Sequence, residues 1–193
     1  RSSRTVGSHA LSIFGDHSDV YNCRQTGFAL LASGDVQEVM DLAGVAHLSA
    51  IKGLVPFIHF FDGFRTSHEL DKVEQMNYAD LADLVDYEAL DAWRAQALNP
   101  EHPMIRATVQ NPDIFFQMRE ANNNDYSALP DIVEGYLGKI SEITGREYHI
   151  FNYYGAPDAE RVIIAMGSVS GCIKETVDFL NARGEKVGFV QVH

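Results

Sequence analysis

The first residues that could do chemistry lie at the start of the chain, between Arg4 and Asp19. This stretch combines an arginine, two histidines (His9 and His17) and two aspartates (Asp16 and Asp19) with a short apolar frame. Their spacing matches no metal-binding motif. A guanidinium suits a carboxylate, because it can bind both oxygens together. We interpret the stretch as one wall of a ligand site. The simpler interpretation is local hydrogen bonding for the histidines, helix capping for the aspartates and solvent exposure for Arg4.

Two further segments hold polar side chains beside expected strand ends. Residues 62–69 leave the carboxyl end of a buried strand, where α/β folds place ligand crevices. Residues 167–171 precede an expected helix, where a phosphate could meet the helix N-terminus. The second segment fits neither the P-loop nor the dinucleotide fingerprint nor the nucleophile elbow. For the first segment a packed turn is favoured over contact with the cofactor region or with another domain, and for the second a tight strand-to-helix turn is favoured.

The elements before residue 61 predict a parallel β-α-β unit. Residues 26–33 form a near-continuous apolar run, typical of a strand buried on both faces. Asp35, with Glu38 three positions later, predicts the start of a helix, and Gly53 its end. Residues 54–61 form a second buried strand. Strand, helix and strand over this length predict a parallel pair joined by a crossover. A short helix is expected through residue 24, and residues 11–14 are expected at or after a strand end.

The remainder predicts more helices and a second unit. Residues 69–93 are expected to form one or two amphipathic helices with a solvated acidic face, the alternative being an acidic docking face for a partner. Turns are expected at residues 99–103 and 111–113, and a helix from Pro130 to Gly145. Strands at 161–166 and 186–192 flank a helix at 172–183. We therefore predict domains at residues 1–150 and 151–193.

Composition limits the functional classes. The chain has 193 residues, 46% of them hydrophobic, and a formal net charge of −12, which argues against nucleic acid and anionic membranes as partners. No apolar run is long enough to span a bilayer, and no signal peptide is visible. Cys23 and Cys172 are far apart, so we expect buried free thiols and no metal or iron–sulfur site formed by them.

Five blocks resemble the pyruvate:ferredoxin (flavodoxin) oxidoreductase family, in the family's own order. They are SHALSIFGDHSDVYNCRQTGFALLAS (8–33), VPFIHFFDGFRTSHE (55–69), ALNPEHPMIR (97–106), QNPDIFFQMREA (110–121) and YYGAPDAERVIIAMGS (153–168). The resemblance implies an α/β fold with a parallel sheet: most of the domain that covers the pyrimidine end of thiamine diphosphate, followed by the start of a transketolase C-terminal-like domain. It also implies a fragment of a much longer chain.

The resemblance further implies the activity of the whole protein. The family oxidatively decarboxylates pyruvate with coenzyme A, and passes electrons through [4Fe-4S] clusters to ferredoxin or flavodoxin. Thiamine diphosphate with Mg²⁺ and the clusters would be bound elsewhere in the full-length protein. The expected assembly is a homodimer, in the cytoplasm or alternatively in a hydrogenosome or mitochondrion-related organelle. The fragment alone should be inactive, because the glutamate that activates the cofactor lies upstream of it in the family.

In the family, an arginine five residues before the His-Ala-Leu-Ser block binds the substrate carboxylate, which here falls on Arg4. Leu11 and Ile13 match positions that wall the substrate's methyl group, with core packing as the alternative. No catalytic or metal-binding residue is expected within this piece. Three other functions stay open: a fusion with an NADPH-dependent flavoprotein reductase, a non-catalytic module like that of some sulfite reductase subunits, and a different 2-oxo acid as substrate.

Overall fold

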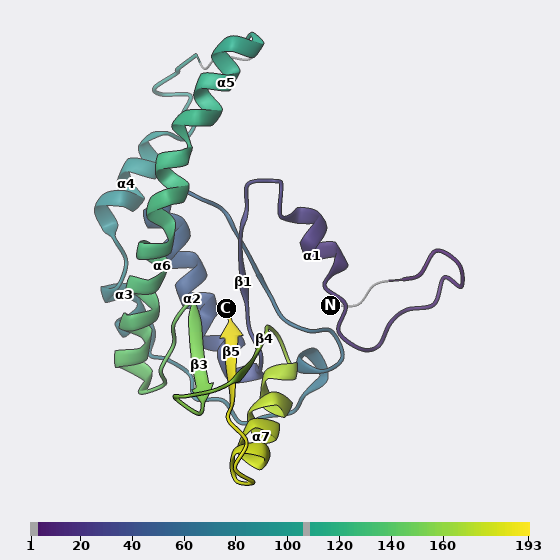
Figure 1. Cartoon of the computed structure of the whole chain (residues 1–193). Coiled ribbons are helices and arrows are strands. Elements are labelled where there is room, and N and C mark those ends of the chain that lie inside the picture. The colour runs from purple at the N-terminus through teal and green to yellow at the C-terminus, as the bar shows by residue number, and fades with distance from the viewer. Residues whose placement is uncertain (1–3, 106–108) are drawn as a thin grey trace.

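The structure is a computed structural model that describes residues 4–105 and 109–193 (Figure 1). The first unit has the predicted β-α-β order. Strands β1 (Ala29–Ala32) and β2 (Phe57–Phe60) pair in parallel, with Ala29 opposite Phe57 and Ala32 opposite Phe60, and helix α2 (Val36–Gly53) connects them. Both strands are shorter than the apolar runs that predicted them. The parallel pairing and the crossover helix are confirmed.

The start of α2 follows the predicted capping pattern. The Asp35 carboxylate accepts a hydrogen bond from the backbone N–H of Glu38 at 2.8 Å. Gly53 is the last helical residue, and the left-handed conformation that ends the helix falls on Leu54, at φ 53°. One face of α2 packs against α6 (Asn123–Thr144). Their contact forms the main core, whose fully buried members include Leu42, Val45, Leu137 and Ile140.

The prediction that Pro130 opens a helix is wrong. α6 begins at Asn123 and Pro130 lies inside it, on an exposed face. A proline inside a helix removes one backbone hydrogen bond, and this position accepts that loss without ending the helix. The proline that does open a helix is Pro112, the first residue of α5 (Pro112–Ala121), where only a turn was expected. The predicted end at Gly145 is confirmed, with φ 70°.

Short helices flank this core. α1 (Ser18–Cys23) has His17 as its N-cap residue, without a side-chain cap, so the expected capping by Asp16 or Asp19 is wrong; the Asp16 carboxylate instead accepts the N–H of Ser18 at 2.9 Å from one position before the cap. The acidic segment forms η1 (Thr66–His68), α3 (Tyr78–Asp83) and α4 (Tyr87–Ala95). In α3 and α4 the acidic side chains are exposed, as predicted, while the half-buried residues Leu81, Leu84 and Val85 pack against the core. None of the helices described is long and apolar enough to cross a membrane.

The second unit has its own three-stranded sheet in the order β3-β5-β4. β4 (Arg161–Ala165) and β5 (Val187–Val192) are parallel and joined by α7 (Val169–Asn181), which confirms the predicted unit, although α7 starts three residues before Cys172. β3 (Phe151–Gly155) is antiparallel to β5 and was not predicted, because its mostly exposed side chains form no buried apolar run.

The two units meet along one strand end. The backbone N–H of Ala32 donates to the carbonyl of His193 at 3.0 Å, so β5 continues beside β1. The second unit nevertheless keeps a core cluster of its own, built on Val177, Val187 and Phe189. We propose the domain boundary between residues 150 and 151 on that basis. Both cysteines are free thiols, and Cys172 is exposed, so the expectation of burial is wrong there because it lies on the outer face of α7.

Candidate functional site

The N-terminal arm, residues 4–17, extends away from the body of the molecule (Figure 1). Backbone hydrogen bonds fold its tip, from Thr5 N–H to the Ala10 carbonyl (3.1 Å) and from His9 N–H to the Thr5 carbonyl (2.9 Å). His9 has φ 57°, which a residue with a side chain rarely adopts outside a turn. Arg4 Nη1 donates to the His9 carbonyl at 2.9 Å, so the guanidinium closes the same turn.

The arm brings two of the three predicted substrate residues together. Arg4 and Leu11 form an isolated antiparallel bridge, and Ile13 lies two residues further along the arm. The side chains of Leu11 and Ile13 are 41% and 51% exposed. Core packing, the alternative for these two residues, therefore does not describe them within this chain. They present apolar surface beside a guanidinium, and their role toward a substrate stays a prediction.

One buried carboxylate holds the base of the arm. Asp62 Oδ1 lies 2.6 Å from His17 Nε2, and Asp62 Oδ2 accepts the backbone N–H of Ser168 at 2.6 Å. Two glycines leave room for it, because a Cβ at Gly15 or at Gly167 would come within 2.8 Å of an Asp62 oxygen. Asp62 thus links the arm, the end of β2 and the turn before α7. The expected local bonding of His17 is wrong, since its partner lies 45 residues away.

The electrostatics of this contact favour an ionised Asp62. Burial alone would raise the pKa of its carboxyl group, but the hydrogen bonds from Ser168 and His17 outweigh burial and lower the pKa below its usual value. The ionised carboxylate can accept from the His17 Nε2–H, whose ring edge also meets the ring of Phe60, with centroids 5.6 Å apart. Asp62 therefore positions neighbouring segments, and a role as a proton donor at neutral pH does not suit it.

The two other candidate segments line one cavity, here named the strand-end crevice. It has a volume of about 500 Å³ and lies beyond the carboxyl ends of β1 and β2, next to the first turn of α7. Asp62 and Thr66 of the first segment are buried, as a packed turn predicts, and a ligand role of the two segments stays a prediction. The sequence suggested the segments separately, and the structure shows that they face each other. The crevice is lined by Gly34, Asp35, Phe64, Arg65, His68, Glu69, Ser168, Ser170, Gly171 and Lys174.

Sequence reasoning missed two buried carboxylates that fix the surroundings of the crevice. Glu38 accepts the N–H of Gly34 at 2.5 Å and the side-chain amide of Gln191 at 2.8 Å, which ties α2 to both β1 and β5. Asp41, fully buried, binds Arg146 through two nitrogens, at 2.7 and 3.2 Å, and the Tyr148 hydroxyl at 2.7 Å. The polar positions inside an otherwise apolar helix pattern were the available signal.

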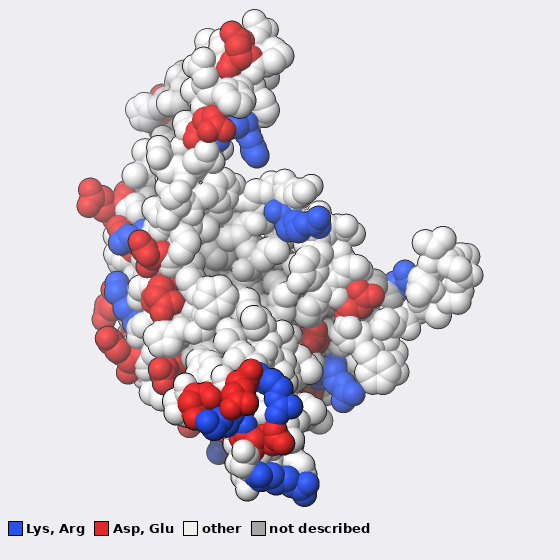
Figure 2. Space-filling view, viewed as in Figure 1, with Lys and Arg blue, Asp and Glu red and all other residues white. Residues whose placement is uncertain are grey.

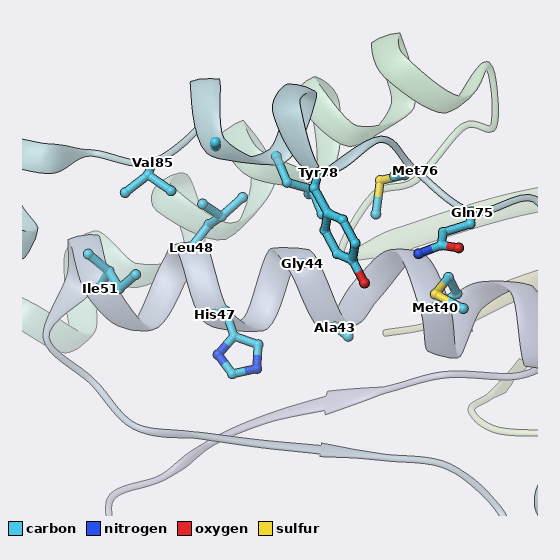
Figure 3. A pocket seen from close by; sticks show the side chains of 12 residues that line it. Met40, Ala43, Gly44, His47, Leu48, Ile51, Gln75, Met76, Tyr78 and Val85 are labelled. Atoms are coloured by element: carbon cyan, nitrogen blue, oxygen red, sulfur yellow. The ribbon is translucent and has the colours of Figure 1, made fainter.

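A second hollow, of about 440 Å³, separates α2 from the segment before and within α3 (Figure 3). Met40, Met76 and Tyr78 stand around one end of it, and His47 lies on the exposed side of α2 near its middle. Its lining is mainly apolar and lacks converging charged groups. It suits apolar packing better than catalysis.

Charge is distributed unevenly over the surface. Acidic side chains gather along the edge formed by α3, α4 and α6, at the left of Figure 2. The hollow between α6 and α1, in the middle of the same view, is almost free of charged side chains. This hollow is therefore suited to an uncharged or apolar partner surface.

Comparison with known proteins identifies the family. The model of the family described as "pyruvate flavodoxin/ferredoxin oxidoreductase, thiamine diP-bdg" matches residues 1–137. The chain belongs to this family. The matched range contains the N-terminal arm, both strands of the first sheet, helices α1 to α5 and most of α6. Residues 151–193 lie beyond it.

Members of the oxidoreductase family match over nearly the whole chain. A pyruvate-flavodoxin oxidoreductase of Enterobacter agglomerans is 63% identical over 192 residues, which cover 100% of this chain and 16% of the relative. The pyruvate:ferredoxin oxidoreductase of Moorella thermoacetica is 59% identical, over 98% of the chain and 16% of its own length. A pyruvate dehydrogenase [NADP(+)] of Cryptosporidium parvum is 47% identical over a region that covers 98% of this chain and 10% of the relative. The chain thus spans about one sixth of the oxidoreductases it matches most strongly.

Proposed function

We propose that this chain is part of a thiamine-diphosphate-dependent oxidoreductase that decarboxylates pyruvate oxidatively to acetyl-CoA and carbon dioxide. The observation that carries the proposal is the family match over residues 1–137, a range that includes an arm presenting a guanidinium beside exposed apolar side chains. Thiamine diphosphate would supply the nucleophilic carbon and accept the electron pair of the bond that breaks. The chain described here would supply a wall for the substrate and would be inactive alone.

The described residues fit the pyrimidine end of that cofactor in one respect. The hollow beside α1 carries almost no charge in Figure 2, as an uncharged aromatic ring prefers. Leu11 and Ile13, both half-exposed, would cover the methyl group of pyruvate and keep water away from the reacting carbon. The chain's own contribution is then shape and water exclusion.

Arg4 would bind the substrate carboxylate. Among the described residues one hydrogen bond holds its guanidinium, to the His9 carbonyl, which leaves its other N–H groups for a ligand. Two parallel bonds to a planar carboxylate would fix the direction from which the neighbouring carbonyl is attacked. Because the carboxylate loses its charge as carbon dioxide leaves, an over-tight ion pair would slow the reaction. Orientation is therefore the role we assign.

Replacing this arginine in the full-length enzyme tests the proposal. Arg4→Ala should lower kcat/KM for pyruvate by roughly 30- to 1000-fold, which corresponds to about 2–4 kcal/mol for a truncated charge pair. The assay is coenzyme A-dependent reduction of a viologen dye by pyruvate. Arg24→Ala is a matched control, since Arg24 is exposed and its guanidinium also donates to a backbone carbonyl, that of Tyr21. Unchanged pyruvate kinetics in Arg4→Ala would remove Arg4 from the site.

The remaining parts of the proposal are supported by the family and by the relatives' names. We propose Mg²⁺ with the cofactor, [4Fe-4S] clusters, coenzyme A, and ferredoxin or flavodoxin as electron acceptor, all bound outside this chain, in a cytoplasmic enzyme. A hydrogenosome or related organelle is the alternative compartment. An NADP⁺-linked fusion, the type that the name of the Cryptosporidium relative indicates, is the alternative acceptor system.

We also propose a homodimer. α5 and the start of α6 project beyond the body as a helical arm in Figure 1, and Phe115, Phe116 and Met118 on it are 56%, 65% and 48% exposed. Three large apolar side chains exposed on one short helix favour an interface there. Phe116→Glu in the full-length enzyme should shift the dimer toward monomer in sedimentation velocity, whereas Phe179→Glu, on the outer face of α7, should not. An unchanged sedimentation coefficient for Phe116→Glu would exclude this arm from the interface.

A further inference from the structure

We propose that the strand-end crevice is a binding site for a phosphate group, held by Arg65, Lys174 and the first turn of α7. This site contains none of the three predicted substrate residues and is not needed for the proposed function, although its Arg65 contacts Phe14 of the N-terminal arm. Its volume of about 500 Å³ falls within the range of small-molecule pockets, and it lies where open α/β sheets bind ligands.

The cations in the crevice are available for a ligand. Among the residues that the structure describes, no carboxylate lies within ion-pair distance of Arg65 or Lys174. The Arg65 guanidinium instead lies over the ring of Phe14, 5.2 Å from its centre. Two carboxylates also line the crevice. That of Asp35 is engaged with the N–H of Glu38, and that of Glu69 belongs to an exposed residue at the rim.

A buried hydroxyl group provides independent support. Ser170 is only 5% exposed, and within the described part of the chain its Oγ makes no hydrogen bond. The Oγ is open to the crevice, where it can bond to water or to an oxygen of a ligand. The Ser170 Oγ lies against Gly34 in the crevice wall, and a Cβ added at Gly34 would come within 2.5 Å of this oxygen. A side chain at position 34 would therefore fill this corner of the crevice.

The start of α7 adds further donors. Its N-cap residue, Ser168, makes no side-chain cap, and Gly171 in the first turn lines the crevice. The N–H groups of a first helical turn lack partners inside the helix and carry a partial positive charge. Two of these donors are already engaged, because Asp62 accepts the N–H of Ser168 and the Gly167 carbonyl accepts that of Ser170, and the negative charge of Asp62 will weaken anion binding. We therefore expect a Kd of roughly 0.1–10 mM for phosphate alone.

The rim of the crevice suggests that the phosphate belongs to a larger molecule. Phe64 and His68 stack in parallel, with ring centroids 4.7 Å apart and an interplanar angle of 6°. Phe64 is 40% exposed, so its ring offers a further apolar face beside the cations. A phosphate ester with a flat ring could use both features. Free phosphate and a nucleotide monophosphate both carry a phosphate anion. Comparing their affinities for the crevice therefore shows whether the ligand is free phosphate or a phosphate ester.

Titration calorimetry on the full chain, at constant ionic strength adjusted with chloride, tests the site. The probes are inorganic phosphate and adenosine 5′-monophosphate. We expect saturable binding of phosphate, weakened at least about tenfold by Lys174→Met and by Ser170→Ala, with Lys139→Met on α6 as the matched control. Equal affinities would identify free phosphate as the ligand, and tighter binding of the nucleotide would identify a phosphate ester; both support the site.

Two results would overturn the proposal. One is heat no different from that of added chloride, and the other is the same Kd in the wild-type chain, Lys174→Met and Arg65→Met. Circular dichroism of each variant separates loss of binding from loss of fold. Because the readout is binding without turnover, failure here leaves the proposed function untouched, and failure of the Arg4 test leaves this site untouched.

Discussion

Removing the charge of Asp62 should destabilise the fold and release the N-terminal arm. The side chain of Asp62 is 6% exposed, and its two oxygens face His17 Nε2 and the Ser168 N–H, each at 2.6 Å. Asp62→Asn keeps the shape and one carbonyl oxygen, but it removes the charge and replaces the second acceptor with a donor. The amide oxygen can still accept the Ser168 N–H, and the amide N–H can donate to His17 Nε2 in the other imidazole tautomer, so both contacts become neutral hydrogen bonds.

The expected loss follows from these contacts. A hydrogen bond to a charged group contributes roughly 1.5–3 kcal/mol. Both bonds change from charge-assisted to neutral, so the free energy of unfolding should fall by about 1–3 kcal/mol. Asp62→Ala should cost somewhat more, because it removes both acceptors. The side chain is too buried for solvent screening to reduce these values strongly.

The same contact predicts how stability depends on pH. The hydrogen bonds from Ser168 and His17 outweigh burial and lower the pKa of Asp62 in the folded chain. The unfolded chain then binds this proton more readily. The stabilisation is present above the unfolded pKa of about 3.8 and is lost as the pH falls through the lower folded value. Asp62→Asn should therefore lose part of its deficit relative to wild type in acid.

Urea denaturation measures the loss, and hydrogen exchange locates it. The matched control is Asp71→Asn, because Asp71 is exposed and, among the residues that the structure describes, its carboxylate accepts only the neighbouring N–H of Lys72. Amides of residues 4–17 should exchange faster in Asp62→Asn and not in the control. A change below about 1 kcal/mol, or unchanged exchange in the arm, would show that Asp62 does not hold these segments together.

Two other sites give sharp stability predictions, each measurable by urea denaturation. Arg146→Met leaves the fully buried Asp41 without its bidentate partner and should lower the free energy of unfolding by roughly 3–5 kcal/mol. Tyr148→Phe removes one hydrogen bond to Asp41 and should lower it by about 1–3 kcal/mol. Equal losses in the two variants would contradict this ranking. Gly145→Ala should cost about 1 kcal/mol, since φ is 70° although no atom lies within 4 Å of the added Cβ. Gly138→Ala, in equally open space inside α6, should stabilise the chain by roughly 0.5–1 kcal/mol, and the same sign for both would refute the conformational explanation.

Features controlled by nearby residues could be predicted from the sequence. The start of α2 depends on a bond from Asp35 to the N–H three positions later, and its amphipathic pattern fixes which face is buried. The parallel β1-α2-β2 unit follows from such local signals, because a crossover between buried strands has few alternatives. The crevice position could be predicted for the same reason: strand ends in a parallel sheet meet at one edge.

Features that depend on distant contacts could not be predicted. Pro130 looked like a helix start, but the packing of α6 against α2 outweighs one lost backbone hydrogen bond. β3 was missed because its exposed aromatic residues lack the apolar pattern of a buried strand. The partners of Asp62 lie 45 and 106 residues away, and no local pattern indicates a pairing at such separations.

The geometry of the arm separates two kinds of perturbation. Its base is fixed by Asp62, which connects it to β2 and to the turn before α7. Its tip is held by short-range bonds, such as that from Arg4 to the His9 carbonyl, and Leu11 and Ile13 stay half-exposed. Arg4→Ala should therefore leave the unfolding free energy within about 0.5 kcal/mol of wild type while it impairs turnover. Asp62→Asn should lower both stability and turnover, because it releases the whole wall.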